Sequence, residues 1–328
     1  MKKILLISTG GTISCKRTAQ GLSPIMSSQE IISFVPEVQK ICEITTLSLI
    51  NKDSTEIDPS DWLQLAKIIE MNYGDYDGFV ICHGTDTMAY TASALSYLIQ
   101  NSQKPIILTG AQKPIDMEIT DAKTNLFDSF LYATSPYSNG IQIVFGGKVI
   151  ISTRARKTKT KSFDAFSSVN FPLIGSIQDR KLIHYIKNRY IEDVKFYDKL
   201  NTKVAIYKLI PSSNPEILDF ILSKNDAVVI ESYGTGGIPS SHNKVLEKYS
   251  KSSKIIVMAT QVAKEGSDIE IYKVGKHLKT GINALEVYDM NIESAVAKLM
   301  WILSITNEQE KVHELFYSTI YNDILLTT

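Results

Sequence analysis

Short apolar runs alternate with amphipathic segments along most of the chain. The first run, 3–7, is rich in β-branched residues and is typical of a strand buried on both faces. Similar runs predict strands at 41–50, 78–82 and 105–109. Helical periods separate them, at 28–35, from 58 onward, at 87–100 and at 121–133. Strict alternation of this kind predicts an α/β fold with a mostly parallel sheet and crossover helices.

The alternation breaks at the apolar runs 141–145 and 149–151, which flank Gly146-Gly147. Two glycines between short strands are a hairpin signal. We therefore expect the sheet to become antiparallel at one edge. The larger, N-terminal domain, 1–185, is thus predicted to contain a mixed sheet.

From about 181 to 201 the chain is charged and hydrophilic without a clear period, and we place a linker at 186–202. Strand and helix patterns then resume, at 204–209, 215–222, 227–231, 244–249, 255–259 and 292–303. They predict a smaller α/β domain with a parallel sheet over 203–328. Its loop Gly234-Thr235-Gly236-Gly237 lacks the spacing of a dinucleotide site, and the chain has no Walker lysine.

Composition narrows the class of protein. The 328 residues are 44% hydrophobic, enough for two cores, and 35 basic residues balance 35 acidic ones. A neutral chain creates no overall field for nucleic acid or a membrane surface. No run approaches the roughly 20 apolar residues of a transmembrane helix, and the stretch after Met1 is too short for a signal peptide. Three cysteines, Cys15, Cys42 and Cys82, have no metal-like spacing and suit a reducing compartment, so we expect the cytoplasm.

Three predicted strands end in small hydroxylated or acidic residues. These ends are Thr9-Gly10-Gly11-Thr12, Asp53-Ser54-Thr55 and His83-Gly84-Thr85-Asp86-Thr87. Each alone has an ordinary explanation as a turn or a helix cap. The carboxyl ends of parallel strands, however, face one crevice, which is where ligands bind in open α/β sheets. Together they can place hydroxyls and carboxylates around one small molecule.

A basic segment, 154–161, carries five lysines and arginines in eight residues. A phosphate-binding patch is the weakest interpretation, because no aromatic residues are interleaved and the chain is neutral. A solvated charged loop is the ordinary one.

The stretch Thr9-Gly10-Gly11-Thr12-Ile13, taken with His83-Gly84-Thr85-Asp86-Thr87-Met88, resembles the two signatures of the bacterial-type L-asparaginase family. The resemblance covers nearly the whole chain in order and spacing. Asp53-Ser54-Thr55 and Phe163-Asp164-Ala165-Phe166 place it nearer the cytoplasmic, type I branch.

The resemblance implies hydrolysis of L-asparagine to L-aspartate and ammonia through an acyl-threonine intermediate, without a cofactor or metal. By position, Thr12 is the nucleophile, and Thr85, Asp86 and Lys157 support proton transfer. A threonine hydroxyl needs an adjacent base to become nucleophilic, and a lysine can be that base. Lys157 is chosen because it lies nine residues ahead of Phe166; Lys159 and Lys161 are expected to be uninvolved.

The resemblance also implies how the substrate is held. Asp53, Ser54 and Thr55 match the family's binders of the α-carboxylate and α-amino groups, and Thr85 and Asp86 join them. Backbone N–H groups at the glycine turn, including that of Gly11, are expected to hold the oxyanion. The resemblance further implies a homo-oligomer, usually a tetramer of close dimers.

One position departs from the family's pattern. Where its bacterial members carry a tyrosine on a mobile loop, this chain has Leu22, in a polar loop predicted at 15–24, and its first tyrosine is Tyr73. Either another tyrosine enters the site or activation differs. Two alternatives to a dedicated asparaginase stay open: an amidohydrolase that also accepts L-glutamine, and an amino-acid-binding or regulatory protein without efficient turnover.

Overall fold

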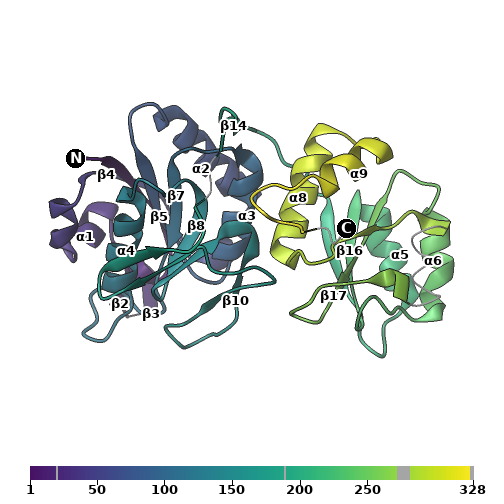
Figure 1. The fold of residues 1–328 in the computed structure, drawn as a ribbon. Coiled ribbons are helices and arrows are strands. Elements are labelled where there is room, and N and C mark those ends of the chain that lie inside the picture. The colour runs from purple at the N-terminus through teal and green to yellow at the C-terminus, as the bar shows by residue number, and fades with distance from the viewer. Residues whose placement is uncertain (20, 188–189, 272–280, 326–328) are drawn as a thin grey trace. The chain divides into compact units, whose positions relative to one another are not determined.

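The computed structural model describes residues 1–19, 21–187, 190–271 and 281–325. The chain divides into two compact units, Met1–Asp198 and Lys199–Thr328 (Figure 1). Both are α/β, so the predicted fold class is confirmed. The domain bounds 1–185 and 203–328, with a linker at 186–202, stay our proposal. Within that linker, β14 (Lys195–Phe196) pairs with β6 (Ile99–Gln100) of unit 1.

Unit 1 is built on an eight-stranded sheet of order β13-β12-β9-β8-β7-β5-β1-β4. Five neighbouring strands are parallel: β4 (Glu43–Lys52), β1 (Lys3–Gly10), β5 (Gly78–Cys82), β7 (Pro105–Thr109) and β8 (Gly140–Phe145). Three are antiparallel: β9 (Lys148–Ile151), β12 (Gly175–Gln178) and β13 (Lys181–His184). The predicted hairpin, β8–β9, is confirmed. Sequence reasoning missed β12 and β13, since β13 alternates between exposed and half-buried residues and carries no apolar run.

The chain leaves β1 for β4 on one side and returns to β5 on the other. The strand order therefore reverses at β1, and the carboxyl ends of β1 and β5 are where sheets of this kind form a ligand-binding crevice. All residues of β5, β7 and β8 are buried, as are residues 4–10 of β1. Cover on both faces explains why these strands read as continuous apolar runs.

Four helices cover the parallel part of the sheet: α1 (Ser28–Ser33), α2 (Pro59–Asn72), α3 (Met88–Leu98) and α4 (Ala122–Thr134) (Figure 1). Two begin at capping boxes, at Ser27 and Asp58. α2 packs against α3 on one face. α4 lies on the other face with α1 and contacts η2 (Pro36–Lys40), the short helix that follows α1.

This arrangement gives one crossover an unusual hand. The connections β4–α2–β5, β5–α3–β7 and β7–α4–β8 all step across the sheet in the same direction. The first two carry their helices on one face and the third on the other. Because nearly all crossovers between parallel strands are right-handed, β7–α4–β8 is the left-handed exception.

Two segments predicted as loops contain hairpins. β2 (Cys15–Thr18) pairs with β3 (Gly21–Pro24), and Arg17 lies opposite Leu22, a residue that is 53% exposed. The basic segment contributes β10 (Ala155–Lys157), which pairs with β11 (Phe166–Ser168) so that Lys157 lies opposite Phe166. Both hairpins are mostly polar, so their residues show no strand pattern.

Unit 2 has a four-stranded parallel sheet of order β15-β16-β17-β18. Its strands are β15 (Val204–Lys208), β16 (Ala227–Ser232), β17 (Ile255–Thr260) and β18 (Leu285–Glu286), and its described longer helices are α5 (Pro215–Lys224), α6 (Asn243–Tyr249), α8 (Ile292–Ile305) and α9 (Gln309–Tyr317). β18 and α9 were not predicted, because β18 has two residues and α9 buries only Val312 and Phe316.

A buried ion pair ties the C-terminal segment of unit 2 to α8. Lys298 and Asp323 lie 2.6 Å apart with both side chains fully buried, and the Lys298 ammonium also donates to the Ser318 carbonyl at 2.6 Å. In the part of the chain that is described, no helix is long and apolar enough to cross a membrane.

Candidate active site

The ends of β1 and β5 are in direct contact through two glycines. A Cβ atom on Gly11 would lie 2.3 Å from both the Cα and the nitrogen of Gly84, and Gly11 has φ of 77°. Only glycine fits here. The Thr9 hydroxyl adds a hydrogen bond of 3.0 Å to the Cys82 carbonyl. Thr12 and Thr85, which directly follow the touching glycines, therefore enter the same crevice.

Lys157 joins the two residues that follow Gly84. Its ammonium donates to Thr85 Oγ1 and to Asp86 Oδ1, at 2.7 Å each. The Lys157 side chain is 16% exposed and that of Asp86 60%. Lys159 instead pairs with Asp164 at 2.6 Å. In the described structure, neither Lys159 nor Lys161 reaches Thr85 or Asp86 with its ammonium group.

Thr12 begins the short helix η1 (Thr12–Ser14) and is half-buried. Among the described residues, no hydrogen bond engages its hydroxyl, which is free for a ligand. The Gly11 N–H, in contrast, donates to the Lys52 carbonyl at 3.0 Å. The geometry gives no support to this N–H as an oxyanion donor. Gly11 is needed at this position for the close contact with Gly84.

At the third strand end, after β4, Asp53 and Thr55 have different contacts from Ser54. Asp53 accepts hydrogen bonds from the N–H of Thr55 at 2.9 Å and from its hydroxyl at 2.7 Å, which is a capping arrangement at an exposed turn. Ser54 is 3% exposed and lies against Gly84, whose added Cβ would be 2.7 Å from the Ser54 Oγ. The Ser54 carbonyl also accepts from the Thr87 hydroxyl at 2.7 Å. Ser54 is therefore in contact with the Gly84 segment, while Asp53 and Thr55 bond to each other.

Gln112 lies beside Thr85 and was missed in the sequence. Thr85 Oγ1 donates to Gln112 Oε1 at 3.3 Å, and Gln112 Nε2 donates to the Ser162 carbonyl at 3.2 Å. The carboxylate of Asp121 receives the Gln112 N–H at 3.0 Å, and burial raises the pKa of Asp121. Gln112 follows β7, so the rule that located the other strand ends could have found it.

His83 fixes the backbone ahead of Thr85. Its Nδ1 donates to the Gly84 carbonyl at 2.7 Å, so its Nε2 accepts from the Thr91 hydroxyl at 2.9 Å. Thr91 in turn accepts from the indole N–H of Trp62 at 2.9 Å. Burial of the ring lowers the pKa of His83 to about 4 and holds it neutral. The chain of bonds thus links α2 and α3 to the Gly84 carbonyl.

Leu22 stands where the family's pattern has a tyrosine, and a substitute would be another tyrosine beside Thr12. Within the described part of this unit, no tyrosine hydroxyl bonds to Thr12, and the exposed Leu22 makes no polar contact with it. The entry of a tyrosine from another segment stays a prediction.

Two family models and several known proteins match this chain. Residues 3–190 match the family described as "Asparaginase, N-terminal", and residues 203–316 match "Glutaminase/Asparaginase C-terminal domain". The L-asparaginase of Thermococcus kodakarensis is 34% identical over 327 residues, which cover 98% of this chain and 99% of that protein. A subunit of the glutamyl-tRNA(Gln) amidotransferase of Pyrococcus abyssi is 32% identical over 340 residues, which cover 99% of this chain and 77% of that protein.

Solved structures give the same result. The thermostable L-asparaginase from Thermococcus kodakarensis superposes with a TM-score of 0.94 at 32% identity and covers 99% of this chain and all of its own. L-asparaginase I from Vibrio cholerae superposes with a TM-score of 0.89 at 28% identity and covers 99% of each chain. With both family domains matched in order, the resemblance predicted from the two threonine motifs is confirmed, and the chain belongs to the asparaginase family.

Proposed function

We propose that this protein hydrolyses L-asparagine to L-aspartate and ammonia, with Thr12 as the nucleophile. The observation that carries the proposal is the position of the Lys157 ammonium, 2.7 Å from both Thr85 Oγ1 and Asp86 Oδ1. These residues lie beside a free threonine hydroxyl at the point where β1 and β5 touch. The relatives named L-asparaginase support asparagine as the substrate.

The reaction would proceed in two steps. The Thr12 oxygen attacks the side-chain amide carbon, the C–N bond breaks, and ammonia leaves with the proton that the hydroxyl gave up. Water then attacks the resulting ester, which releases aspartate and restores the threonine. As a neutral amine, Lys157 can take a proton from Thr85 while Thr85 takes the proton of Thr12, and the same path returns a proton to the leaving ammonia. In the second step the path takes a proton from water and returns one to the Thr12 oxygen.

The polar groups beside Thr12 and Thr85 would bind the substrate. The carboxylate of Asp86 is exposed to the crevice and is suited to the α-ammonium of an amino acid. Ser54, packed against Gly84, is placed to serve the α-carboxylate, and Asp53 and Thr55 would have to leave their mutual bonds to assist it. Simple amides without an amino-acid head should therefore be poor substrates.

Ammonia release from purified protein tests the proposal. We expect release from L-asparagine that disappears in Thr12→Ala. Asparagine-dependent thermal stabilisation with no ammonia would instead support a binding or regulatory protein.

The likeness to an amidotransferase component gives a second candidate, an amidase that serves a larger assembly. Turnover of free asparagine by the isolated protein would speak against it. Release from L-glutamine at a comparable rate would support the broader amidohydrolase.

Two further properties belong to the proposal. We propose a homo-oligomer, a tetramer of close dimers, which light scattering after size-exclusion chromatography would test. We also propose the cytoplasm, because all three cysteines are free and buried, as suits a reducing compartment.

A further inference from the structure

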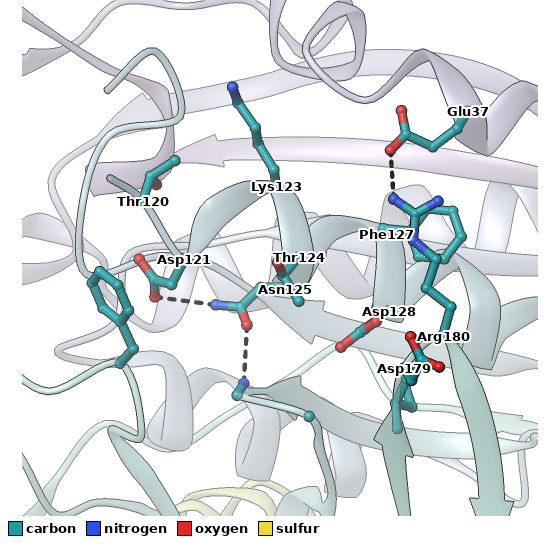
Figure 2. A pocket seen from close by; sticks show the side chains of 14 residues that line it. Glu37, Thr120, Asp121, Lys123, Thr124, Asn125, Phe127, Asp128, Asp179 and Arg180 are labelled. Carbon is teal, nitrogen blue, oxygen red and sulfur yellow. Dashed lines mark hydrogen bonds and ion pairs between the residues drawn. The ribbon is translucent and has the colours of Figure 1, made fainter. Parts of the chain in front are cut away.

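A cavity of about 430 Å³ lies within unit 1, and one of its lining residues is Asp121, the acceptor of the Gln112 N–H. It is bounded by α4, η2, the turn between β8 and β9, and the turn between β12 and β13 (Figure 2). None of the predicted catalytic or substrate-binding residues lines it. Its size is that of a pocket for a small organic molecule.

Asp128, on α4, is the unusual group in the cavity wall. Its residue is 4% exposed, and within the described chain no hydrogen bond or ion pair engages its carboxyl group. Burial raises the pKa of Asp128 to about 6, and the charge of Arg180 opposes this shift. The carboxyl is therefore mostly ionised at neutral pH. A buried carboxylate without a donor is costly, so the cavity favours a ligand that supplies one.

Two of the nearby donors, Arg180 and Asn125, already bond to other groups, as Figure 2 shows. Arg180 donates to Glu37 at 3.0 Å, and its guanidinium lies 4.4 Å from the centre of the Phe127 ring. Asn125 donates to the Gly110 carbonyl at 3.0 Å and to Asp121 at 3.2 Å, and it accepts from the Gly146 N–H at 2.9 Å. In this structure neither of them donates to Asp128, so its carboxylate is open to a donor from a ligand.

We propose that this cavity binds a small organic molecule with a primary ammonium group, which donates to the Asp128 carboxylate. The hydrocarbon part of the ligand packs on Phe127, Phe163 and Ile177. The cavity wall also favours a positively charged ligand, because the lining contains four acidic residues and two basic ones. The opposite occupant, an inorganic anion held by Lys123 and Arg180, is the competing outcome.

Isothermal titration of the full chain with 2-phenylethylamine, an ammonium ion at pH 7.5, tests the proposal. We expect saturable binding of one molecule per chain. Its neutral analogue, 2-phenylethanol, should bind about tenfold or more weakly, because it cannot form the charged hydrogen bond. Inorganic phosphate should not displace the amine. Absence of amine binding, equal binding of the alcohol, or displacement by phosphate would overturn the proposal.

Variants locate the binding. Asp128→Asn keeps the size of the side chain and should weaken amine binding about tenfold or more. Asp75→Asn removes the same charge from an exposed position outside the cavity and should bind as the wild type does. Thr124→Phe, at an exposed residue of the cavity wall, should block the space without touching Asp128. Unchanged binding in both Asp128→Asn and Thr124→Phe would refute the site, and no step of this test depends on asparagine turnover.

Discussion

His83 is the group through which we expect acid to destabilise unit 1. Burial lowers its pKa from 6.5 to about 4, and the hydrogen bond to the Gly84 carbonyl only partly opposes this shift. Protonation would require the Thr91 hydroxyl, which already accepts from Trp62, to turn and accept a second bond. Between pH 6.5 and 4 the unfolded chain binds a proton that the folded chain does not, so the free energy of unfolding falls as the pH falls. This shift in the pKa of His83 corresponds to about 3 kcal/mol in the free energy of unfolding.

The assay is urea denaturation between pH 7 and pH 4, followed by tryptophan fluorescence. The chain has two tryptophans, and in a Trp301→Phe background the remaining one, Trp62, lies in the hydrogen-bonded chain of His83. His83→Gln keeps a donor and an acceptor but cannot be protonated. Between pH 7 and pH 4 we expect the free energy of unfolding of this variant to fall by about 3 kcal/mol less than that of its parent.

The comparison between variants is needed because burial also lowers the pKa of His184 and of His242. His313→Gln, at an exposed histidine, is the matched control and should follow its parent. If His83→Gln and its parent lost the same free energy between pH 7 and 4, the buried neutral ring would not be the source of acid sensitivity.

Three further predictions concern other residues. Lys157→Met should lower kcat about a hundredfold or more through loss of proton transfer, measured by ammonia release; equal losses in Lys159→Met and Lys161→Met would show that a charged loop was mistaken for a catalytic group. Leu22→Tyr should lower kcat if a tyrosine from elsewhere has replaced the family's loop tyrosine, and a Tyr→Phe scan without one strongly impaired variant would contradict that substitution. Lys298→Met should destabilise unit 2 by about 3–5 kcal/mol in urea denaturation, because it strands a buried carboxylate; a loss near zero would contradict the structural role of the pair.

The strand ends could be located from the sequence because buried parallel strands give continuous apolar runs. Gly11 and Gly84 were found in this way, but their contact depends on strand order, which no local pattern encodes. Lys157 was chosen by family spacing, and its bond to Thr85 joins residues 72 positions apart.

Other features were not predicted, because their sequences show no distinctive pattern. Gln112 is an amide at a strand end, where only hydroxyls and acids were expected. The β12–β13 hairpin is short and its outer strand is partly exposed, so it shows no apolar period. Asp128 reads as a polar position of a helix, and only the packing of α4 against η2 and the hairpin turn makes it a buried charge.

The hand of the β7–α4–β8 connection is also a marker of descent. About 2% of crossovers between parallel strands are left-handed, so two proteins with the exception at the same step of the same strand order would rarely have reached it independently. Threonine nucleophiles and glycine turns, in contrast, recur on unrelated folds. For a distant protein whose sequence no longer resembles this one, the face on which the helix after the fourth parallel strand lies would therefore be better evidence of common ancestry than its catalytic residues.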